Sequence, residues 1–332
     1  MLEEHRQHGN LYDRGKGPYS SQGYGGSRHR CGKIILFPKN AIIAITHRAG
    51  GSSGIGLATT SLLLKLGAAV VIGDINPPTA QQQQQQNDKL SFVKTDVSKW
   101  EDLVNLFKHA KHHHRRIDHV FANAGISSRA NYLEDHFAPD TGDLLEPSPT
   151  TLDINLRGVI NTAYLGMHYM RTQTPQGGSV VLTASASSFQ RFRVTDYTTA
   201  KHGVLGFMRG LLPALDAAGL PIRVNALAPD WTATGIIPPQ LVGILGDQIQ
   251  GPEVVAEAAA LCMVDQARQG QLIYSRGGVH REVEEGVLMP AGREIVGKGG
   301  QGDDAMLEKM MRELMREMEV QQRKEQLDGS GS

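Results

Sequence analysis

The chain has 332 residues, enough for one large α/β domain with extensions or for two ordinary domains. Its 34 basic and 34 acidic side chains leave no formal net charge, so the basic excess typical of proteins that bind nucleic acids or anionic membranes is missing. The longest apolar stretch near the N-terminus, residues 34–46, is interrupted by Pro38, Lys39 and Asn40, which excludes a transmembrane helix of about 20 residues and argues against a secretory signal. We therefore expect a soluble, cytoplasmic protein with a small-molecule partner.

The beginning of the chain differs in composition from the rest. Residues 1–32 are rich in Gly, Ser, Arg and Tyr and have no hydrophobic period, which predicts a disordered tail. The two cysteines, Cys31 and Cys262, lie far apart and lack the spacing of a metal site, so we expect two reduced thiols and no disulfide.

From Asn40 onward, short β-branched runs alternate with longer helical segments. We expect strands at residues 41–46, 68–75, 90–97, 118–125, 178–185 and 222–229, and helices at 53–67, 99–112, 150–173 and 197–219. Continuous apolar strands separated by crossover helices indicate a parallel sheet covered on both faces. The fold class is therefore α/β, with a single doubly wound domain over residues 33–290.

Two biased segments interrupt this pattern. The glutamine run 81–86 is expected to be a solvated connector between the second and third strands. His112, His113, His114 and His119 are close together in sequence, but adjacent residues of a helix point in different directions, so we expect an exposed helix end and no metal site.

The C-terminal extension, residues 291–332, is expected to contain a helix followed by a free tail. Leu307, Met311, Leu314 and Met318 recur at helical spacing and form one apolar stripe. Such a stripe predicts a helix that docks on the core of the domain or on a second subunit.

A glycine-rich turn follows the first expected strand. Gly50, Gly54 and Gly56 stand between that strand and a helix, where the missing Cβ atoms let backbone amides approach a pyrophosphate at the helix N-terminus. Three glycines are weak evidence in a chain with 38, but the flanking strand and helix supply the context that a dinucleotide site requires.

The second expected strand ends at Asp74, 18 residues beyond Gly56. A carboxylate there can accept hydrogen bonds from the adenosine ribose and repel a 2′-phosphate, which favours NAD over NADP. Arg48, beside the glycine turn, could accept a 2′-phosphate and offset Asp74, so NADP remains the alternative cofactor.

A second constellation lies in the other half of the chain. Tyr197 and Lys201 are four residues apart and share one face of a helix, where an ammonium can stabilise a phenolate and bring its pKa nearer to neutrality. Ser185, in the loop after the preceding strand, offers a hydroxyl that can hydrogen-bond a reacting oxygen beside Tyr197.

Eight motifs occur in a fixed order: GGSSGIG, GDIN, TDV, FANAG, DINLRG, TASAS, YTTAK and IRVNALAP. Over about residues 33–285 the chain resembles the short-chain dehydrogenases/reductases, and among them the fungal members similar to 15-hydroxyprostaglandin dehydrogenase, many of which serve secondary metabolism. The resemblance implies a Rossmann domain that transfers a hydride reversibly between a nicotinamide cofactor and a secondary alcohol or ketone. The apolar segment 231–249 favours a hydrophobic substrate.

The resemblance also implies residue roles. Tyr197 would donate or accept the proton, Lys201 would lower its pKa and bind the nicotinamide ribose, and Ser185 would polarise the substrate carbonyl. Asn155 would hold a water molecule of the proton relay. The implied cofactor-binding residues are Gly50, Ser52, Ser53, Gly54, Ile55, Gly56, Asp74, Asp96, Val97, Asn123, Ala124, Gly125, Tyr197, Lys201, Pro229 and Thr234. A homodimer or homotetramer, formed through the helices around 155–171 and 197–217, is implied as well.

Three departures from the family pattern matter. Ser185 lies 12 residues before Tyr197, one fewer than usual, so Ser187 and Thr183 remain substitutes for it. Asp230 stands where a glycine usually follows Pro229. Residues 47–49 appear inserted before the glycine turn, and we expect a bulge that leaves the glycines in register.

Two other functions stay open. One is a cofactor-binding regulator or scaffold that kept the fold and lost turnover. The other is a lyase or epimerase that uses the same tyrosine. For the hydride-transfer reaction, we expect the substrate to be selected by residues 126–149 and 231–249, the loops at the carboxyl ends of the strands.

Overall fold

The computed structural model describes residues 42–46, 54–77, 89–297, 306, 309–318 and 320–321. Its elements in chain order are β1 (Ile42–Thr46), α1 (Gly54–Lys65), β2 (Ala69–Asp74), β3 (Leu90–Lys94), α3 (Trp100–His114), β4 (His119–Ala122), α4 (Thr150–Leu152), η1 (Asp153–Arg157), α5 (Gly158–Thr172), β5 (Gly178–Thr183), η2 (Ala186–Ser188), α6 (Thr195–Ala217), β6 (Ile222–Pro229), α7 (Pro239–Leu245), η3 (Gly246–Gln248), α8 (Pro252–Val264), β7 (Leu272–Arg276), β8 (Val279–Glu282), η4 (Glu284–Leu288) and α9 (Met289–Val296). Of the short turns, η1 and η4 are π-helical, and η2 and η3 are 3-10 turns.

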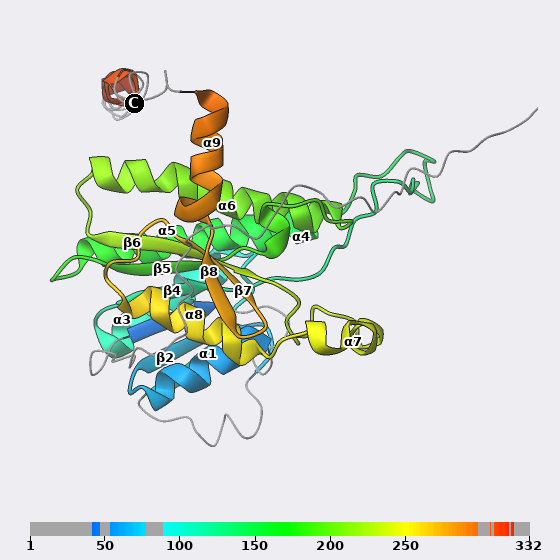
Figure 1. Cartoon of the computed structure of the whole chain (residues 1–332), viewed down its shortest axis with the longest axis horizontal. Helices are drawn as coiled ribbons and strands as arrows, with labels where there is room; N and C mark the ends of the chain where they lie inside the picture. The colour runs from blue at the N-terminus through cyan, green and yellow to red at the C-terminus, as the bar shows by residue number, and fades with distance from the viewer. Residues whose placement is uncertain are drawn as a thin grey trace, which may run out of the picture.

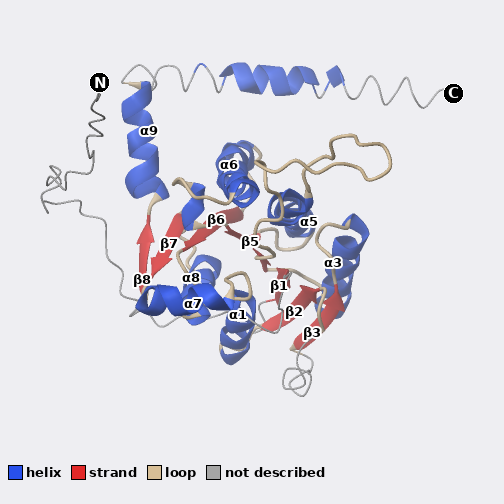
Figure 2. Ribbon diagram, turned by 90° about the vertical axis from the view of Figure 1, so that its right-hand side faces the viewer, coloured by secondary structure: helices blue, strands red, loops and turns tan. Residues whose placement is uncertain are grey.

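The described strands form one eight-stranded sheet in the order β3-β2-β1-β4-β5-β6-β7-β8 (Figure 1). Every neighbouring pair is parallel except β7 and β8, which form an antiparallel hairpin at the edge. Helices α3, α5 and α6 lie on one face of the sheet and α1 and α8 on the other (Figure 2). The predicted doubly wound α/β fold with helices on both faces is therefore confirmed.

The core is divided by the sheet into two apolar layers. Val120 and Val180 point into the layer under α3, α5 and α6, whereas their neighbours Phe121 and Val181 point into the layer under α1 and α8. Because successive strand residues face opposite sides, a strand covered on both faces must be apolar throughout. The continuous apolar runs of β2, β4 and β5 follow from this requirement.

Several elements were predicted close to their observed positions. The expected helix 150–173 exists as a continuous α4-η1-α5 segment, and the expected strand cores at β2 to β6 are present. The elements after residue 238 were not predicted individually, namely α7, α8, β7, β8 and α9. The glutamine run and residues 1–32 lie outside the described residues.

The histidine-rich segment is in part an exposed helix end. His112 and His113 are exposed in the last turn of α3, which ends at His114 before Arg115 with a φ of 66°. Grouping His119 with them was wrong, because His119 is buried in β4 and its Nδ1 lies 2.8 Å from the Ser179 hydroxyl. Burial lowers the pKa of His119 to about 4.

The described residues of the C-terminal helix do not pack on the core, and Leu307 lies outside the described residues. Residues 309–318 are helical, and large apolar side chains such as Met311, Leu314 and Met318 are about half exposed. Docking on a second subunit stays a prediction. Within the described segments, no helix has the length and apolar character to cross a membrane, and no group of three or more His, Cys, Asp or Glu side chains is arranged to hold a metal ion.

Candidate active site

The sequence-predicted residues gather at one edge of the sheet. Asp74 ends β2, Asn123 follows β4, Ser185 follows β5 and Pro229 ends β6. Because these strands are parallel and adjacent through β1, their carboxyl ends meet at the same edge. Ligands of open α/β sheets bind at such an edge.

Tyr197 and Lys201 lie one turn apart in the first turns of α6. The Lys201 ammonium is almost fully buried and donates a hydrogen bond to the Thr183 carbonyl at the end of β5, at 2.7 Å. Its Nζ lies 5.6 Å from the centre of the Tyr197 ring. Burial lowers the pKa of Lys201 to about 7, since the charged form loses water.

Of the three candidate hydroxyls, that of Ser185 is hydrogen-bonded to Tyr197. The Thr183 hydroxyl donates to Asn123 Oδ1 at 3.0 Å, and the buried Ser187 hydroxyl has no hydrogen-bond partner among the described residues. Burial raises the pKa of Tyr197, and the bond with Ser185 lowers it in part. The lowering of this pKa by Lys201 stays a prediction.

Ser188, which the sequence reading missed, fixes the loop that carries Ser185. The Ser185 hydroxyl accepts a bond from the Ser187 amide, and the Ser185 amide donates to the Ser188 hydroxyl, each at 3.2 Å. The Ser188 hydroxyl donates in turn to the Lys201 carbonyl at 2.7 Å. These bonds form a capping box at the start of η2, but the usual sequence signature of that motif has Glu or Gln at the position of Ser188, so little signal for this role was present in the sequence.

Asn155 lies in the π-helical turn η1, fully buried. Its side-chain oxygen accepts from the Ile126 amide and its nitrogen donates to the Ile126 carbonyl, both at 2.8 Å. Gly125 lies between Asn155 and Lys201, because a Cβ on Gly125 would be 3.5 Å from Asn155 Oδ1 and 3.8 Å from Lys201 Nζ. The water-holding role of Asn155 stays a prediction.

Asp196, directly before Tyr197, is the main functional candidate that the sequence reading missed. This buried carboxylate accepts bonds from the Ser128 hydroxyl and from the amides of Arg129 and Ala130 at 2.9 and 3.1 Å. It also accepts from the Tyr197 amide at 2.8 Å. Burial by itself raises the pKa of Asp196, but the bonds from Ser128 and Arg129 outweigh it and bring the pKa to about 2.

Of the expected glycine-rich turn, the structure describes the part at the start of α1. Gly54 opens this helix with a φ of 68°, a backbone conformation that favours glycine, and Gly56, two residues later, is buried. A Cβ on Gly54 would be 3.1 Å from Thr234 Cγ2, so the loop after β6 lies against the start of the helix. Gly50, Ser52, Ser53 and the inserted residues 47–49 lie outside the described residues, and the expected bulge stays a prediction.

The other residues predicted to bind the cofactor are buried or are held by local hydrogen bonds. Asp74 is buried and accepts from the Asn76 amide at 2.8 Å. Asp96 accepts from the Ser98 amide and hydroxyl at 3.0 and 2.6 Å, which starts the approach to α3. Val97 is buried against Gly158, and Ala124 is buried beside Asn123. The arrangement fits a dinucleotide, because Asp74 and Gly125 lie at the same sheet edge as the start of α1, and Gly125 carries no side chain beside Lys201.

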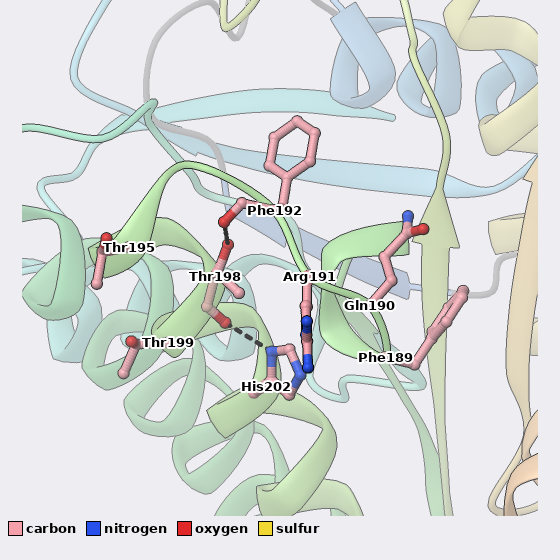
Figure 3. Close-up of a pocket in the computed structure, with 8 residues that line it drawn as sticks. All are labelled: Phe189, Gln190, Arg191, Phe192, Thr195, Thr198, Thr199 and His202. Carbon is pink, nitrogen blue, oxygen red and sulfur yellow. Dashed lines mark hydrogen bonds between the residues drawn. The ribbon is translucent and has the colours of Figure 1, made fainter. Parts of the chain in front are cut away.

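A pocket of about 480 Å³ lies beside the start of α6. It is lined by Phe189, Gln190, Arg191, Phe192, Thr195, Thr198, Thr199 and His202 (Figure 3). Helical spacing places these α6 residues on a different side of the helix from Tyr197 and Lys201. Phe192, which projects away from His202 in Figure 3, contacts Trp231 with ring centres 5.5 Å apart.

Comparisons with known proteins identify the family. The family model described as short chain dehydrogenase matches residues 42–240. The chain is 49% identical over 277 residues to the short-chain dehydrogenase/reductase ascJ of Acremonium egyptiacum, covering 82% of this chain and 91% of that protein. It is 30% identical over 196 residues to 15-hydroxyprostaglandin dehydrogenase (NAD(+)) of Rattus norvegicus, covering 57% of this chain and 68% of that protein.

Solved structures share the fold. Levodione reductase has a TM-score of 0.61 and 24% identity, covering 72% of this chain and 97% of its own. The 3-ketoacyl-(acyl-carrier-protein) reductase of Brucella melitensis, complexed with NADH, has a TM-score of 0.60 and 24% identity, covering 72% of this chain and 98% of its own.

Proposed function

Because the chain belongs to the short-chain dehydrogenase/reductase family of oxidoreductases, we propose that it transfers a hydride between a nicotinamide cofactor and a secondary alcohol or ketone. The observation that carries this proposal is the contact set of Ser185, Tyr197 and Lys201 at the cofactor edge of the sheet. Proton transfer to a carbonyl oxygen, or from an alcohol oxygen, is assisted by a hydrogen-bond donor, a proton carrier and a cation, and these three groups can supply them.

Each residue has a chemical task in this proposal. In the reducing direction, the Tyr197 hydroxyl gives its proton to the substrate oxygen while the Ser185 hydroxyl donates a hydrogen bond to the same oxygen. In the oxidising direction, the Tyr197 phenolate takes the alcohol proton. A charged Lys201 beside the ring would stabilise that phenolate. The bound cofactor supplies or accepts the hydride at its nicotinamide ring.

The residues fit NAD as the cofactor, with NADP as the alternative. Asp74 at the end of β2 supports NAD, because a carboxylate there repels a 2′-phosphate. The rat dehydrogenase is named for NAD(+), and the Brucella reductase structure is complexed with NADH. Residues 52–53 and 229–234 would hold the pyrophosphate and nicotinamide portions.

The substrate class and setting are part of the same proposal. Apolar residues of segment 231–249 favour a hydrophobic alcohol or ketone, and relatives such as the Acremonium protein and the Penicillium roqueforti reductase prx4 support a role in fungal secondary metabolism. We further propose a cytoplasmic homodimer or homotetramer that pairs through α5 and α6.

Turnover with each cofactor tests the proposal. The purified chain is given NAD(H) or NADP(H) and a panel of hydrophobic secondary alcohols and ketones. Tyr197→Phe is expected to lower kcat by about 100- to 10,000-fold, the usual contribution of a positioned proton carrier. Tyr164→Phe, on the exposed side of α5, is the matched control and should keep full activity. Unchanged activity in Tyr197→Phe would contradict the proposal.

The two other functions give different results in the same assay. A regulator or scaffold would bind cofactor and turn over no substrate. A lyase or epimerase would form product with no net change of cofactor.

A further inference from the structure

Asp230 connects two strands at the cofactor edge of the sheet. It is the first residue after β6, and its amide donates to the Ser275 carbonyl of β7 at 3.0 Å. Its carboxylate accepts a hydrogen bond from the Tyr274 hydroxyl at 2.8 Å and lies 3.3 Å from Arg276 Nε. Tyr274 and Arg276 are two apart in β7 and therefore share one side of the strand.

The contacts continue into the loop that follows. The Asp230 carbonyl accepts from the Thr232 hydroxyl at 2.8 Å. The buried side chain of Gln250 donates to that hydroxyl at 3.1 Å and to the Ser275 carbonyl at 2.8 Å. The backbone amide of Gln250 donates to the Trp231 carbonyl, and the backbone carbonyl of Gln250 accepts from the Ala233 amide, both at 2.9 Å. Residues 230–233 are thus held to β7 and to Gln250.

This held segment ends against the cofactor helix. Thr234 is the next residue, and its methyl group is the nearest neighbour of the Cβ position of Gly54, which opens α1. A series of direct contacts therefore runs from the side chains of β7, through Asp230, to the turn that would hold the pyrophosphate.

We propose that Asp230 is a positioning residue for the nicotinamide cofactor, which fixes the loop from Pro229 to Thr234 by its bonds to Tyr274 and Arg276. The inference rests on the proposed function. Arg276 is 60% exposed, so its ion pair with Asp230 contributes little, whereas the partly buried bond from Tyr274 contributes more. A glycine at this position would remove both contacts and add backbone freedom.

Cofactor affinity measured without substrate tests this assignment. NADH binding is followed by fluorescence titration in the wild type, Asp230→Gly, Asp230→Asn and Tyr274→Phe. We expect Asp230→Gly to raise the dissociation constant about tenfold and Tyr274→Phe about threefold, in line with one or two hydrogen bonds. Asp230→Asn retains an oxygen that can accept the Tyr274 bond and should lie near the wild type. In steady-state assays the KM for NADH should rise while kcat stays within about twofold.

Two controls separate positioning from general damage. Asp247→Gly places a glycine in the same loop, at an exposed carboxylate, and should leave NADH binding unchanged. The double variant Asp230→Gly/Tyr274→Phe should bind NADH no more weakly than Asp230→Gly, because the Tyr274 hydrogen bond is already lost in Asp230→Gly. If Asp230→Gly does not fold, the NADH affinity of Tyr274→Phe, which loses a single oxygen atom, tests the positioning role instead.

The outcomes distinguish this inference from the proposed function. If the wild type binds neither NADH nor NADPH, the proposed function fails. If the wild type binds NADH, and Asp230→Gly and Tyr274→Phe bind it equally tightly, the proposed function stands and the positioning role is overturned. An equal loss of affinity in Asp247→Gly would also overturn it.

Discussion

Two loops leave the same edge of the sheet and are held in different ways. The loop of residues 126–149, after β4, is bonded at its root to Asn155 and Asp196 and then extends away from the domain (Figures 1 and 2). The segment of residues 230–250, after β6, is bonded to β7 at both ends, through Asp230 at its start and through the Gln250 side chain at its end. We expect the difference to match two tasks, because residues 229–234 would hold a cofactor of one shape, whereas residues 126–149 and the apolar residues later in the second segment would face substrates that vary.

The extended part of the first loop is held by local bonds. Its backbone contacts join Ala138 to Asp143 and His136 to Leu145, within one small hairpin. Leu133 is 96% exposed, and Phe137 and Leu144 are more than half exposed. An apolar surface held only at its root can be replaced in evolution without cost to the core, which suits a region that selects substrates.

The largest effect is expected at the root of the first loop. Asp196→Ala removes the acceptor of four hydrogen bonds beside Tyr197, and we expect a loss of about 3 kcal/mol in the free energy of unfolding, together with a lower kcat/KM for substrate. Urea denaturation and steady-state kinetics measure the two effects. If NADH affinity falls more than kcat/KM, the two loops do not divide their tasks as described.

The pKa of Asp196 adds a dependence on pH. Its folded value of about 2 is below the ordinary value of 3.8, so its contribution to stability is complete above pH 4 and is lost as the pH falls toward 2. Asp196→Asn should therefore flatten the acid limb of the stability curve between pH 4 and 2. An acid limb identical to that of the wild type would contradict the bonded carboxylate.

A smaller effect is expected in the second segment. Gln250→Ala removes the side chain that joins Thr232 to Ser275, and we expect the free energy of unfolding to fall by about 2 kcal/mol. The dissociation constant for NADH should rise, with little change in the KM for substrate. Gln248→Ala, an exposed neighbour in η3, is the matched control. Hydrogen exchange of residues 231–234 would show directly whether the segment loosens.

The smallest effect on stability is expected at the tip of the first loop. Leu133→Ser and Leu144→Ser change exposed side chains, so the free energy of unfolding should move by less than about 0.5 kcal/mol. The KM for a hydrophobic substrate should nevertheless rise, with cofactor affinity unchanged. An unchanged KM across the substrate panel would remove the tip from substrate selection.

The parts of this site that sequence could predict are those set by local spacing. Tyr197 and Lys201 are four apart on one helix, and the glycines stand between a strand and a helix, so short patterns were sufficient to find them. Asp196 and the contacts of Asp230 were not predicted, because Ser128 and Tyr274 lie 68 and 44 residues away from them, and only the folded chain brings these partners together. The role of Thr183 was also hidden, since it bonds Lys201 through its backbone.

The same limit applies to the fold. The early strands were predicted because they are short apolar runs that alternate with longer helical segments. Helix α8 was missed because it is rich in alanine and buried on most sides, so it has no polar face to mark its period. The antiparallel strand β8 follows β7 after a two-glycine turn. The alternation of strands and helices earlier in the chain does not predict this antiparallel hairpin.

The bond from Lys201 to the Thr183 carbonyl bears on how this protein can diverge. The acceptor is a main-chain atom, so replacing the side chain at position 183 leaves it in place, provided that β5 keeps its register with β4 and β6. Descendant sequences can therefore drift at this position while the ammonium keeps its orientation. What selection must preserve here is the alignment of three strands, and that constraint is distributed over many buried residues.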